Sequence, residues 1–469
     1  SCFHLPKSKK TCIYINYCMK KKDDIDYFFN PRTIAVIGAS RFENKVGNVV
    51  FKNLLASKRD VFPVNKNVDK IMNYNCYPSI LKIPVDIDLA VICLPAPEVP
   101  NIMKECARKK VKAAIIIPSG FSEIGEKGKK IEEEVIKIAK KANIRIIGPN
   151  CLGLIDTRQK LNTTFFDKIP KVGKMAFISQ SGALGVAILD WATKENFGFS
   201  KFISIGNAVD IGFSELLNYI KNDEETKVIG LYIESLKDGR EFIDACKNTA
   251  KEKEIIVLKA GKGEAGKRAA FSHTASMAGS DDVYNAVFKQ CGVIRVEKVE
   301  DLFELSLILQ MNKRINGNKV LIITNGGGPG VITTDAFESY GFDVVKLPEN
   351  VIKQINNVLP EHWSHNNPID VVGDAQADRY RSVFNIIKNE NFYDFLVCIL
   401  TPQAMTQPEE TARALVTLNN EINKPCFACF WGGEKVEKAK EILRNNNLLN
   451  FEDPFKLARL LSYVLSKNR

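Results

Sequence analysis

The sequence has 469 residues, 45% hydrophobic and 26% charged, a composition typical of a folded globular chain of roughly three domains. It contains no run of 18 apolar residues, which argues against a membrane-spanning helix. The formal net charge of +11 is modest for this length, and most basic residues alternate with acidic ones, which disfavours nucleic-acid binding.

The first 22 residues hold six lysines and no acid, and we expect them to form a basic tail ahead of the first domain. The apolar stretch at 13–17 is too short for a secretory signal. Two alternatives stay open: Met19 is the natural start of the chain, or the tail is an organellar presequence. The second is a minority interpretation because the tail contains no arginine.

Twelve cysteines are scattered along the chain, several of them in apolar runs, which predicts a reducing compartment and therefore a cytoplasmic protein. Cys426 and Cys429 form a CxxC pair within a strand-like segment, without a second pair nearby. We interpret this pair as structural and keep a redox or metal role as the alternative. The spacing of the remaining histidines and cysteines predicts no metal site.

Strand-like and helix-like segments alternate almost throughout, which predicts an α/β fold with mostly parallel sheets. A first domain at 23–149 has five expected strands, a pattern typical of a Rossmann-like sheet. Two further domains, at 150–311 and 312–469, both open with a strand, a Gly/Ser-rich turn and a helix, so we expect both to follow one flavodoxin-like plan. The expected strands are residues 33–37, 60–64, 89–94, 113–117, 144–147, 174–178, 202–205, 228–233, 255–258, 320–323, 342–345, 395–400 and 426–430.

The first predicted turn, Gly38-Ala39-Ser40, follows a strand directly and precedes Lys45 and a helix. Glycine lets the backbone approach a pyrophosphate, and the helix N-terminus adds free N–H groups. The full GxGxxG pattern is not met, and the second strand ends without an acid for a ribose, so a nucleotide other than NAD is favoured. A plain strand-to-helix turn remains the alternative.

Two more turns are suited to an anion: Ser179-Gln180-Ser181-Gly182 and the glycine-rich run from Gly326 to Gly330. Between them in sequence lies His273, one of four histidines, on a loop of small residues. Glu234 directly follows six apolar residues, which places it at the carboxyl edge of the sheet, where it could fix one ring nitrogen. A nucleophilic imidazole and two helix N-termini are the groups needed to hold a phosphorylated histidine.

With these residues, the chain resembles the α subunit of NDP-forming acyl-CoA synthetases, especially ADP-forming acetate–CoA ligases, and more distantly the succinyl-CoA synthetase α subunit. The resemblance runs from about Asp24 to the C-terminus. It is carried by the three turns and by further motifs, which are Gly148-Pro-Asn-Cys-Leu-Gly153, Gly206-Asn-Ala-Val-Asp210, Tyr232-Ile-Glu234, Ser272-His273-Thr274, Asn367-Pro-Ile-Asp370 and Gly373-Asp-Ala375.

The resemblance implies a CoA-binding first domain and two succinyl-CoA synthetase-like domains. It implies that His273 is phosphorylated and that Glu234 accepts a hydrogen bond from its ring. The other implied site residues fall into two groups. CoA would contact Gly38, Ala39, Ser40, Lys45, Asn65, Pro95 and Pro118; the phosphoryl and acyl groups would contact Asn150, Ser179, Gln180, Ser181, Gly182, Gly326, Gly327, Gly328 and Gly330.

The implied activity interconverts acyl-CoA, ADP and phosphate with a carboxylic acid, CoA and ATP, with acetate as the favoured acid. Nothing after Asp370 suggests an ATP-grasp domain, so ADP or ATP and Mg²⁺ are expected on a partner β subunit, in an α2β2 assembly. Two other hypotheses remain: a non-catalytic CoA-binding or acyl-CoA-sensing protein, and an NAD-dependent dehydrogenase. His273, Glu234 and the two phosphate turns favour the enzyme over the sensor.

Overall fold

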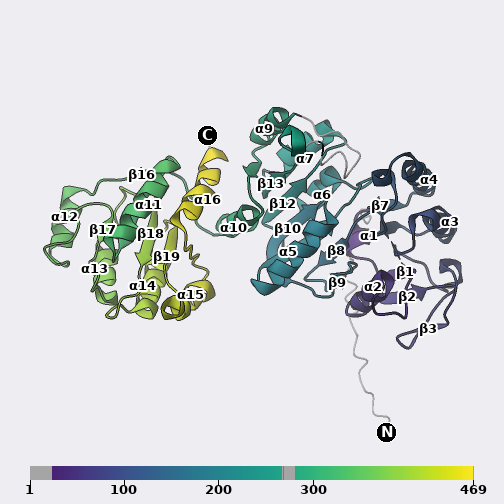
Figure 1. Ribbon diagram of the computed structural model, residues 1–469, viewed down its shortest axis with the longest axis horizontal. Coiled ribbons are helices and arrows are strands. Elements are labelled where there is room, and N and C mark those ends of the chain that lie inside the picture. The colour runs from purple at the N-terminus through teal and green to yellow at the C-terminus, as the bar shows by residue number, and fades with distance from the viewer. Residues whose placement is uncertain (1–23, 267, 269–279, 468–469) are drawn as a thin grey trace, which may run out of the picture.

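The computed structural model describes residues 24–266, 268 and 280–467, and Figure 1 shows three lobes in a row. The predicted α/β class, with one Rossmann-like and two flavodoxin-like domains, is confirmed. The basic tail at 1–22, Met19 and His273 lie outside the described residues. Among the described helices, none is both long enough and apolar enough to cross a bilayer.

The first sheet is entirely parallel, in the order β2-β1-β5-β6-β7. Its strands are β1 (Thr33–Ile37), β2 (Asp60–Val64), β5 (Leu89–Ile92), β6 (Ala113–Ile116) and β7 (Arg145–Ile147), all near their predicted positions. The helices α2 (Val46–Leu55), α3 (Val99–Lys109) and α4 (Glu126–Ala142) connect them. The strands are nearly continuous apolar runs, as expected where helices cover both faces of a parallel sheet.

The second sheet has the order β14-β13-β12-β10-β11-β8-β9. The parallel strands are β10 (Lys171–Ser179), β11 (Gly198–Ser204), β12 (Val228–Ile233), β13 (Glu254–Lys259) and β14 (Ile294–Val296). A hairpin, β8 (Gly153–Asp156) and β9 (Leu161–Asn162), adds antiparallel strands at one edge. The sequence prediction missed β8, β9 and β14, which are short and lack a long apolar run.

The third sheet is parallel and contains β15 (Lys319–Thr324), β16 (Asp343–Val344), β17 (Ile369–Asp370), β18 (Phe395–Leu400) and β19 (Cys426–Phe430). Cys426 and Cys429 both lie on β19 and pack into different hydrophobic clusters, one on each face of the sheet. Burial raises the pKa of the Cys426 thiol to about 12. Two buried thiols on opposite faces cannot form a disulfide, so the structural interpretation of this CxxC pair is favoured.

Neighbouring domains share their hydrophobic cores. On β10, Ala176 and Ile178 join a buried cluster with residues of the first sheet, whereas Met175 and Phe177 join a cluster with residues of the third. Side chains alternate between the two faces of a strand, so β8 and β10 to β13 each contribute to both clusters. The second domain is therefore packed on both sides by its neighbours.

Helices α10 (Val299–Leu309) and α16 (Pro454–Lys467) lie between the second and third lobes in Figure 1. Arg459 on α16 pairs with Asp301 on α10 through two hydrogen bonds of 2.8 and 3.0 Å, and the Asp301 side chain is fully buried. Lys456 pairs with Glu304 at 3.1 Å on the same helices. These ion pairs fix the last helix of the chain against the second domain.

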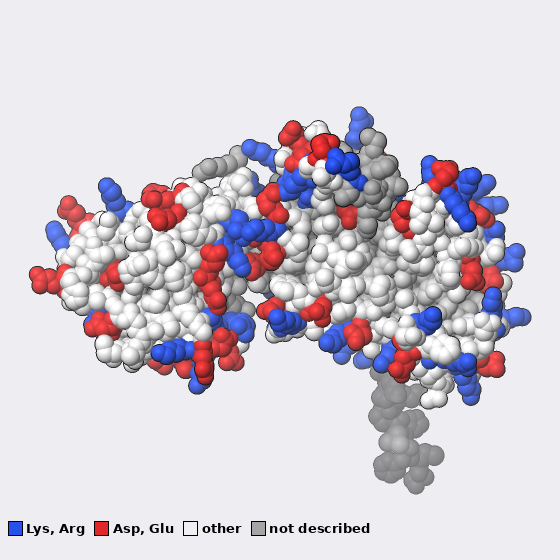
Figure 2. All heavy atoms as spheres, viewed as in Figure 1, with Lys and Arg blue, Asp and Glu red and all other residues white. Residues whose placement is uncertain are grey.

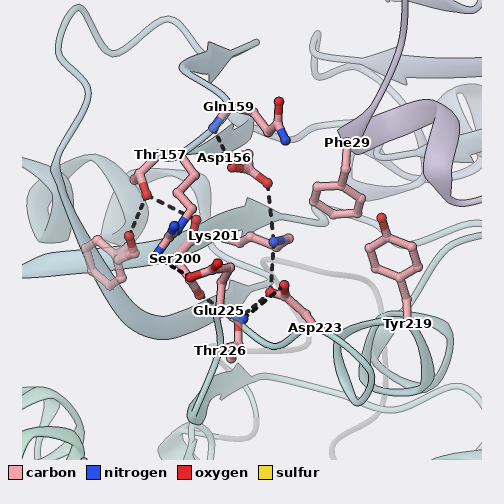
Figure 3. A network of polar contacts seen from close by, with 12 residues as sticks. Phe29, Asp156, Thr157, Gln159, Ser200, Lys201, Tyr219, Asp223, Glu225 and Thr226 are labelled. Atoms are coloured by element: carbon pink, nitrogen blue, oxygen red, sulfur yellow. Dashed lines mark hydrogen bonds and ion pairs between the residues drawn. The ribbon is translucent and has the colours of Figure 1, made fainter.

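A polar network of the second domain lies against Phe29 of the first domain (Figure 3). Lys201 on β11 lies between Asp156 and Asp223, with Nζ–Oδ2 distances of 3.2 and 2.8 Å. Its ammonium also lies 5.8 Å from the ring centroid of Phe29, which stacks on Tyr219 at 4.9 Å. Burial alone would raise the pKa of Asp223, but hydrogen bonds from Lys201 and Thr226 outweigh it and lower the pKa.

We expect Lys201→Met to destabilise the protein by about 3–5 kcal/mol, because it leaves the buried carboxylate of Asp156 and the partly buried carboxylate of Asp223 without their cation. The midpoint of urea unfolding measures this. Since folding lowers the pKa of Asp223, the stabilisation is present above roughly pH 4 and is lost as the pH falls through the folded-state pKa. The difference between variant and wild type should therefore shrink in acid.

The matched control is Lys194→Met, since the side chain of Lys194 is 82% exposed and lies 3.9 Å from Glu195. We expect this change to alter stability by less than about 0.5 kcal/mol. Equal shifts in both variants would contradict a structural role for the Lys201 network.

Candidate functional site

The turn after β10 carries the predicted anion-binding residues of the second domain. The Ser179 hydroxyl accepts a hydrogen bond from the Ser181 N–H (3.1 Å) and donates to the Ser181 carbonyl (3.0 Å). Ser181 is the N-cap of α5 (Gly182–Lys194), and its hydroxyl accepts from the Leu184 N–H at 3.3 Å. The turn is therefore rigid, and the N-terminus of α5 faces the carboxyl edge of the sheet, where anions are stabilised.

Gln180 uses its side chain to hold the end of the neighbouring strand β12. Its Oε1 accepts hydrogen bonds from the N–H groups of Glu234 (2.6 Å) and Ser235 (3.0 Å), and its Nε2 donates to the Ser235 carbonyl (3.0 Å). Glu234 and Ser235 are 6% and 7% exposed. The structure thus brings Ser179, Gln180, Ser181 and Glu234 together at one edge of the second sheet.

Asn150 connects this edge to the first domain. It has a φ of +57°, its N–H donates to the Pro118 carbonyl (2.9 Å), and its Nδ2 donates to Oδ1 of Asn207 (3.3 Å). Asn207 in turn donates to Glu123 (2.8 Å) and Glu132 (3.0 Å) of the first domain. Burial would raise the pKa of Glu123, but the hydrogen bonds from Asn207 and from backbone N–H groups lower it.

A cavity of about 800 Å³ lies between α4 and the loops that follow β10, β11 and β12. Its lining includes Glu132, Gln180, Asn207, Ser235 and Lys237. The Lys237 ammonium donates to the carbonyls of Asn207 (2.9 Å) and Ala208 (3.1 Å), and burial lowers its pKa. The volume is sufficient for a small organic ligand. Sequence reasoning assigned no role to Asn207 or Lys237, although the motif Gly206–Asp210 signalled this loop.

The turn Gly38-Ala39-Ser40 lies at the carboxyl edge of the first sheet and is held from two sides. Asn65 Nδ2 donates to the Ala39 carbonyl and Asn48 Nδ2 donates to the Ser40 carbonyl, both at 2.8 Å. Gly38 has a φ of +89°, a conformation that favours glycine. Lys45 is exposed and is the N-cap of α2.

Helix α2 approaches this turn so closely that position 47 requires glycine. A Cβ atom on Gly47 would lie 2.0 Å from the Gly38 carbonyl oxygen. Pro95 and Pro118 follow β5 and β6 at the same sheet edge as Gly38, and the Pro118 carbonyl binds Asn150. All the residues predicted for CoA therefore lie where ligands bind in open parallel sheets.

The third domain repeats the geometry of the turn after β10. The Thr324 hydroxyl accepts from the Gly326 N–H and donates to the Gly326 carbonyl, both at 3.0 Å. Asn325 exchanges two hydrogen bonds with the backbone of Thr401, which follows the neighbouring strand β18. Gly326 is the N-cap of α11 (Gly327–Ser339), Gly327 and Gly328 are exposed, and Gly330 is buried. These hydrogen bonds all lie within the third domain.

His273 lies outside the described residues, but the strand that leads to its loop is described. Ala260 follows β13, and its N–H donates to the Ile233 carbonyl at 2.9 Å, one residue before Glu234. Within residues 24–266, 268 and 280–467, no three His, Cys, Asp or Glu side chains gather as metal ligands would. On the face shown in Figure 2, acidic and basic side chains are interspersed over all three lobes.

Three family models match the chain in succession. They are a CoA binding domain at residues 32–157, a succinyl-CoA ligase like flavodoxin domain at 172–309 and a ligase-CoA domain at 320–458. The order of these matches follows that of the three sheets, although the first match extends over β8 of the second sheet.

Curated relatives match over most of the chain. The acetate–CoA ligase [ADP-forming] II subunit alpha of Pyrococcus furiosus is 42% identical over 92% of this chain and 95% of the relative. The acetate–CoA ligase [ADP-forming] I of Archaeoglobus fulgidus is 40% identical over 94% of this chain. The chain spans only 63% of that longer relative.

A solved structure agrees with the whole arrangement. The dinucleotide-forming acetyl-coenzyme A synthetase 1 of Ca. Korarchaeum cryptofilum, in complex with phosphate and ADP, superimposes with a TM-score of 0.88. The two chains are 36% identical, and the match covers 95% of this chain and 97% of the other.

We expect Gly47→Ala to weaken CoA binding by at least about tenfold, because the added methyl group must displace the Gly38 carbonyl and so distort the turn. Calorimetric titration of the purified protein with CoA measures the change. Gly239→Ala is the control, since Gly239 begins α7 (Gly239–Thr249) and its added Cβ would meet no atom within 4 Å. Equal CoA affinity in both variants would contradict the assignment of the Gly38 turn.

Proposed function

The chain belongs to the family of ADP-forming acetate–CoA ligases, and from this membership we propose that it is the α subunit of an ADP-forming acyl-CoA synthetase. The enzyme interconverts acyl-CoA, ADP and phosphate with a carboxylic acid, CoA and ATP, and acetyl-CoA is the favoured thioester. The observation that carries the proposal is the convergence of Glu234, the N-terminus of α5 and the strand end leading to His273 beside one cavity.

The first step forms an acyl phosphate. An oxygen of inorganic phosphate attacks the thioester carbonyl, the C–S bond breaks, and CoA leaves as the thiolate. Pro118, at the same sheet edge as the turn at Gly38, is bonded to Asn150, which in turn is bonded to Asn207 of the cavity lining. This connection would bring the thioester carbonyl to the edge of the second sheet, and we assign Asn150 to the place where acyl group and phosphate meet.

The second step transfers phosphorus to His273. A ring nitrogen attacks the phosphorus atom, the P–O bond to the acyl oxygen breaks, and the carboxylate leaves with that electron pair. The reaction depends mainly on position and on stabilising the charge of the phosphoryl oxygens. The N-terminus of α5, with Ser179, Gln180, Ser181 and Gly182, would supply one set of backbone donors, and Glu234 would accept a hydrogen bond from the ring.

The third step passes the phosphoryl group from His273 to ADP. The repeated turn in the third domain, from Gly326 to Gly330, is our second phosphate cradle, because the hydroxyl at the end of its strand binds the turn backbone as Ser179 does in the first. We place ADP or ATP and Mg²⁺ on a partner ATP-grasp β subunit in an α2β2 assembly. Two relatives are named as α subunits, and a longer relative extends well beyond the matched part, which supports a second component.

We also propose a cytoplasmic location. All nine cysteines that the structure describes carry free thiols, and burial raises the pKa of seven of them well above the usual range of a thiol. A chain with many unpaired cysteines suits a reducing compartment.

Acetyl phosphate carrying labelled phosphorus should phosphorylate the wild-type protein and leave His273→Ala unlabelled. The label should be lost in acid and survive in base, as expected for a phosphorus–nitrogen bond. The matched control is His362→Ala, which removes an exposed histidine from the loop before Pro368 and should be labelled like the wild type. Equal labelling of wild type and His273→Ala would remove this histidine from the mechanism.

A further inference from the structure

Two side chains bind every backbone polar group of Glu234 and Ser235. Gln180 accepts from both N–H groups and donates to the Ser235 carbonyl. The remaining group, the Glu234 carbonyl, accepts a hydrogen bond of 2.9 Å from the ammonium of Lys259. Glu234 is therefore held by one side chain that follows β10 and one that ends β13, the two strands on either side of β12.

Lys259 is the last residue of β13 and is 2% exposed. Its ammonium also donates to the Ala260 carbonyl, and it lies 4.6 Å from the ring centroid of Tyr284. Tyr284 belongs to α9 (Asp281–Gln290). A single charged group thus binds the strand end carrying Glu234, the strand end carrying Ala260, and a helix packed beside them.

The equivalent position in the third domain shows that the fold does not require a lysine there. Ile233 on β12 pairs with Lys259 on β13, and Leu400 on β18 pairs with Phe430 on β19. In the second sheet the Ala260 N–H donates to the Ile233 carbonyl, and in the third the Trp431 N–H donates to the Leu400 carbonyl, both at 2.9 Å. Phe430 is fully buried. An apolar residue is the ordinary occupant of a buried strand end, since burying an ammonium is unfavourable unless it is hydrogen-bonded.

The charges around Lys259 come from three elements. Burial, together with the nearby Arg295 of β14, lowers the pKa of Lys259 to about 8, while Asp281 of α9 and Glu234 oppose the shift. Arg295 donates to Asp281 at 2.7 Å. Lys262, which pairs with Glu297, is the remaining charged group of this cluster. The ammonium is therefore charged at neutral pH and becomes neutral within the range of an ordinary alkaline titration.

We propose that Lys259 is a positioning residue of the reaction, whose ammonium fixes the backbone of Glu234 and of Ala260 so that the carboxylate meets the histidine ring in one orientation. The inference rests on the proposed function, because Glu234 and His273 acquire their roles there. Lys259 binds backbone groups in this arrangement, so its loss should affect the rate of phosphoryl transfer more than the binding of substrate.

The test measures the rate of phosphoenzyme formation from labelled acetyl phosphate between pH 6 and 10. We expect Lys259→Met to lower the limiting rate by roughly 10- to 100-fold, with the half-saturating concentration of acetyl phosphate changed less than about twofold. The wild-type rate should fall as the pH rises through about 8, where Lys259 loses its proton. Lys259→Arg, which keeps its charge in this range, should recover part of the rate and lack that fall.

Two control variants distinguish the effect of the Lys259 ammonium from a general disturbance of the structure. Lys253 lies just before β13, at its opposite end, and also donates to a backbone carbonyl, that of Asp223 at 2.7 Å. Lys253→Met should keep the wild-type rate and pH profile. Gln180→Leu removes the other side chain that binds the backbone of Glu234 and Ser235, without removing a charge. It should lower the rate of phosphoenzyme formation, and that rate should still fall as the pH rises. Circular dichroism establishes that each variant is folded.

If Lys259→Met formed the phosphoenzyme at the wild-type rate and that rate still fell as the pH rose through about 8, the inference would be overturned while the proposed function stayed intact. The same holds for equal rate losses in Lys259→Met and Lys253→Met. Absence of label in the wild type would instead overturn the proposed function itself.

Discussion

The peptide unit between Glu234 and Ser235 is the constraint on which the site depends. It follows a buried strand at the carboxyl edge of a parallel sheet, where backbone N–H and carbonyl groups no longer have a strand partner. Gln180 and Lys259 supply those partners from the two adjacent strands. A buried carboxylate can act in one defined direction only when its own backbone is fixed, and here the fixing groups are side chains close to the proposed chemistry.

The shared hydrophobic cores extend this constraint to the whole chain. Because Ala176 and Ile178 pack toward the first domain while Met175 and Phe177 pack toward the third, a movement of β10 would disturb both clusters. The contact of the Lys201 ammonium with the Phe29 ring and the bonds of Asn207 to Glu123 and Glu132 add contacts across the first junction. The turn at Gly38 and the edge that carries Glu234 are therefore held at a fixed separation, as the proposed transfer between two sites in one chain requires.

Much of the fold could be predicted because the buried strands of a parallel sheet are continuous runs of apolar residues. The strands at Thr33–Ile37, Val228–Ile233 and Phe395–Leu400 follow directly from such runs, and Glu234 could be placed because an acid ends one of them. The hairpin of β8 and β9 could not, since strands of four and two residues carry too little pattern. The role of Gln180 was also hidden, because a polar residue in a turn gives no sign of which backbone it binds. Lys259 was missed for a related reason: a lysine at a strand end is usually solvated, and only tertiary packing shows it to be buried.

The two repeated turns indicate how one structural plan can serve unequal roles. Both combine a strand-terminal hydroxyl, an amide that binds the neighbouring strand end, and a helix that begins immediately afterwards. They differ at the next strand, where the second sheet has Lys259 and the third has Phe430. The hydroxyl and amide fix the start of the helix in both domains. The buried ammonium occurs beside Glu234, so under the proposed function it accompanies the residue to be oriented rather than the turn itself. On that proposal, the turn geometry serves the binding of phosphate, and the ammonium serves the direction of the reaction.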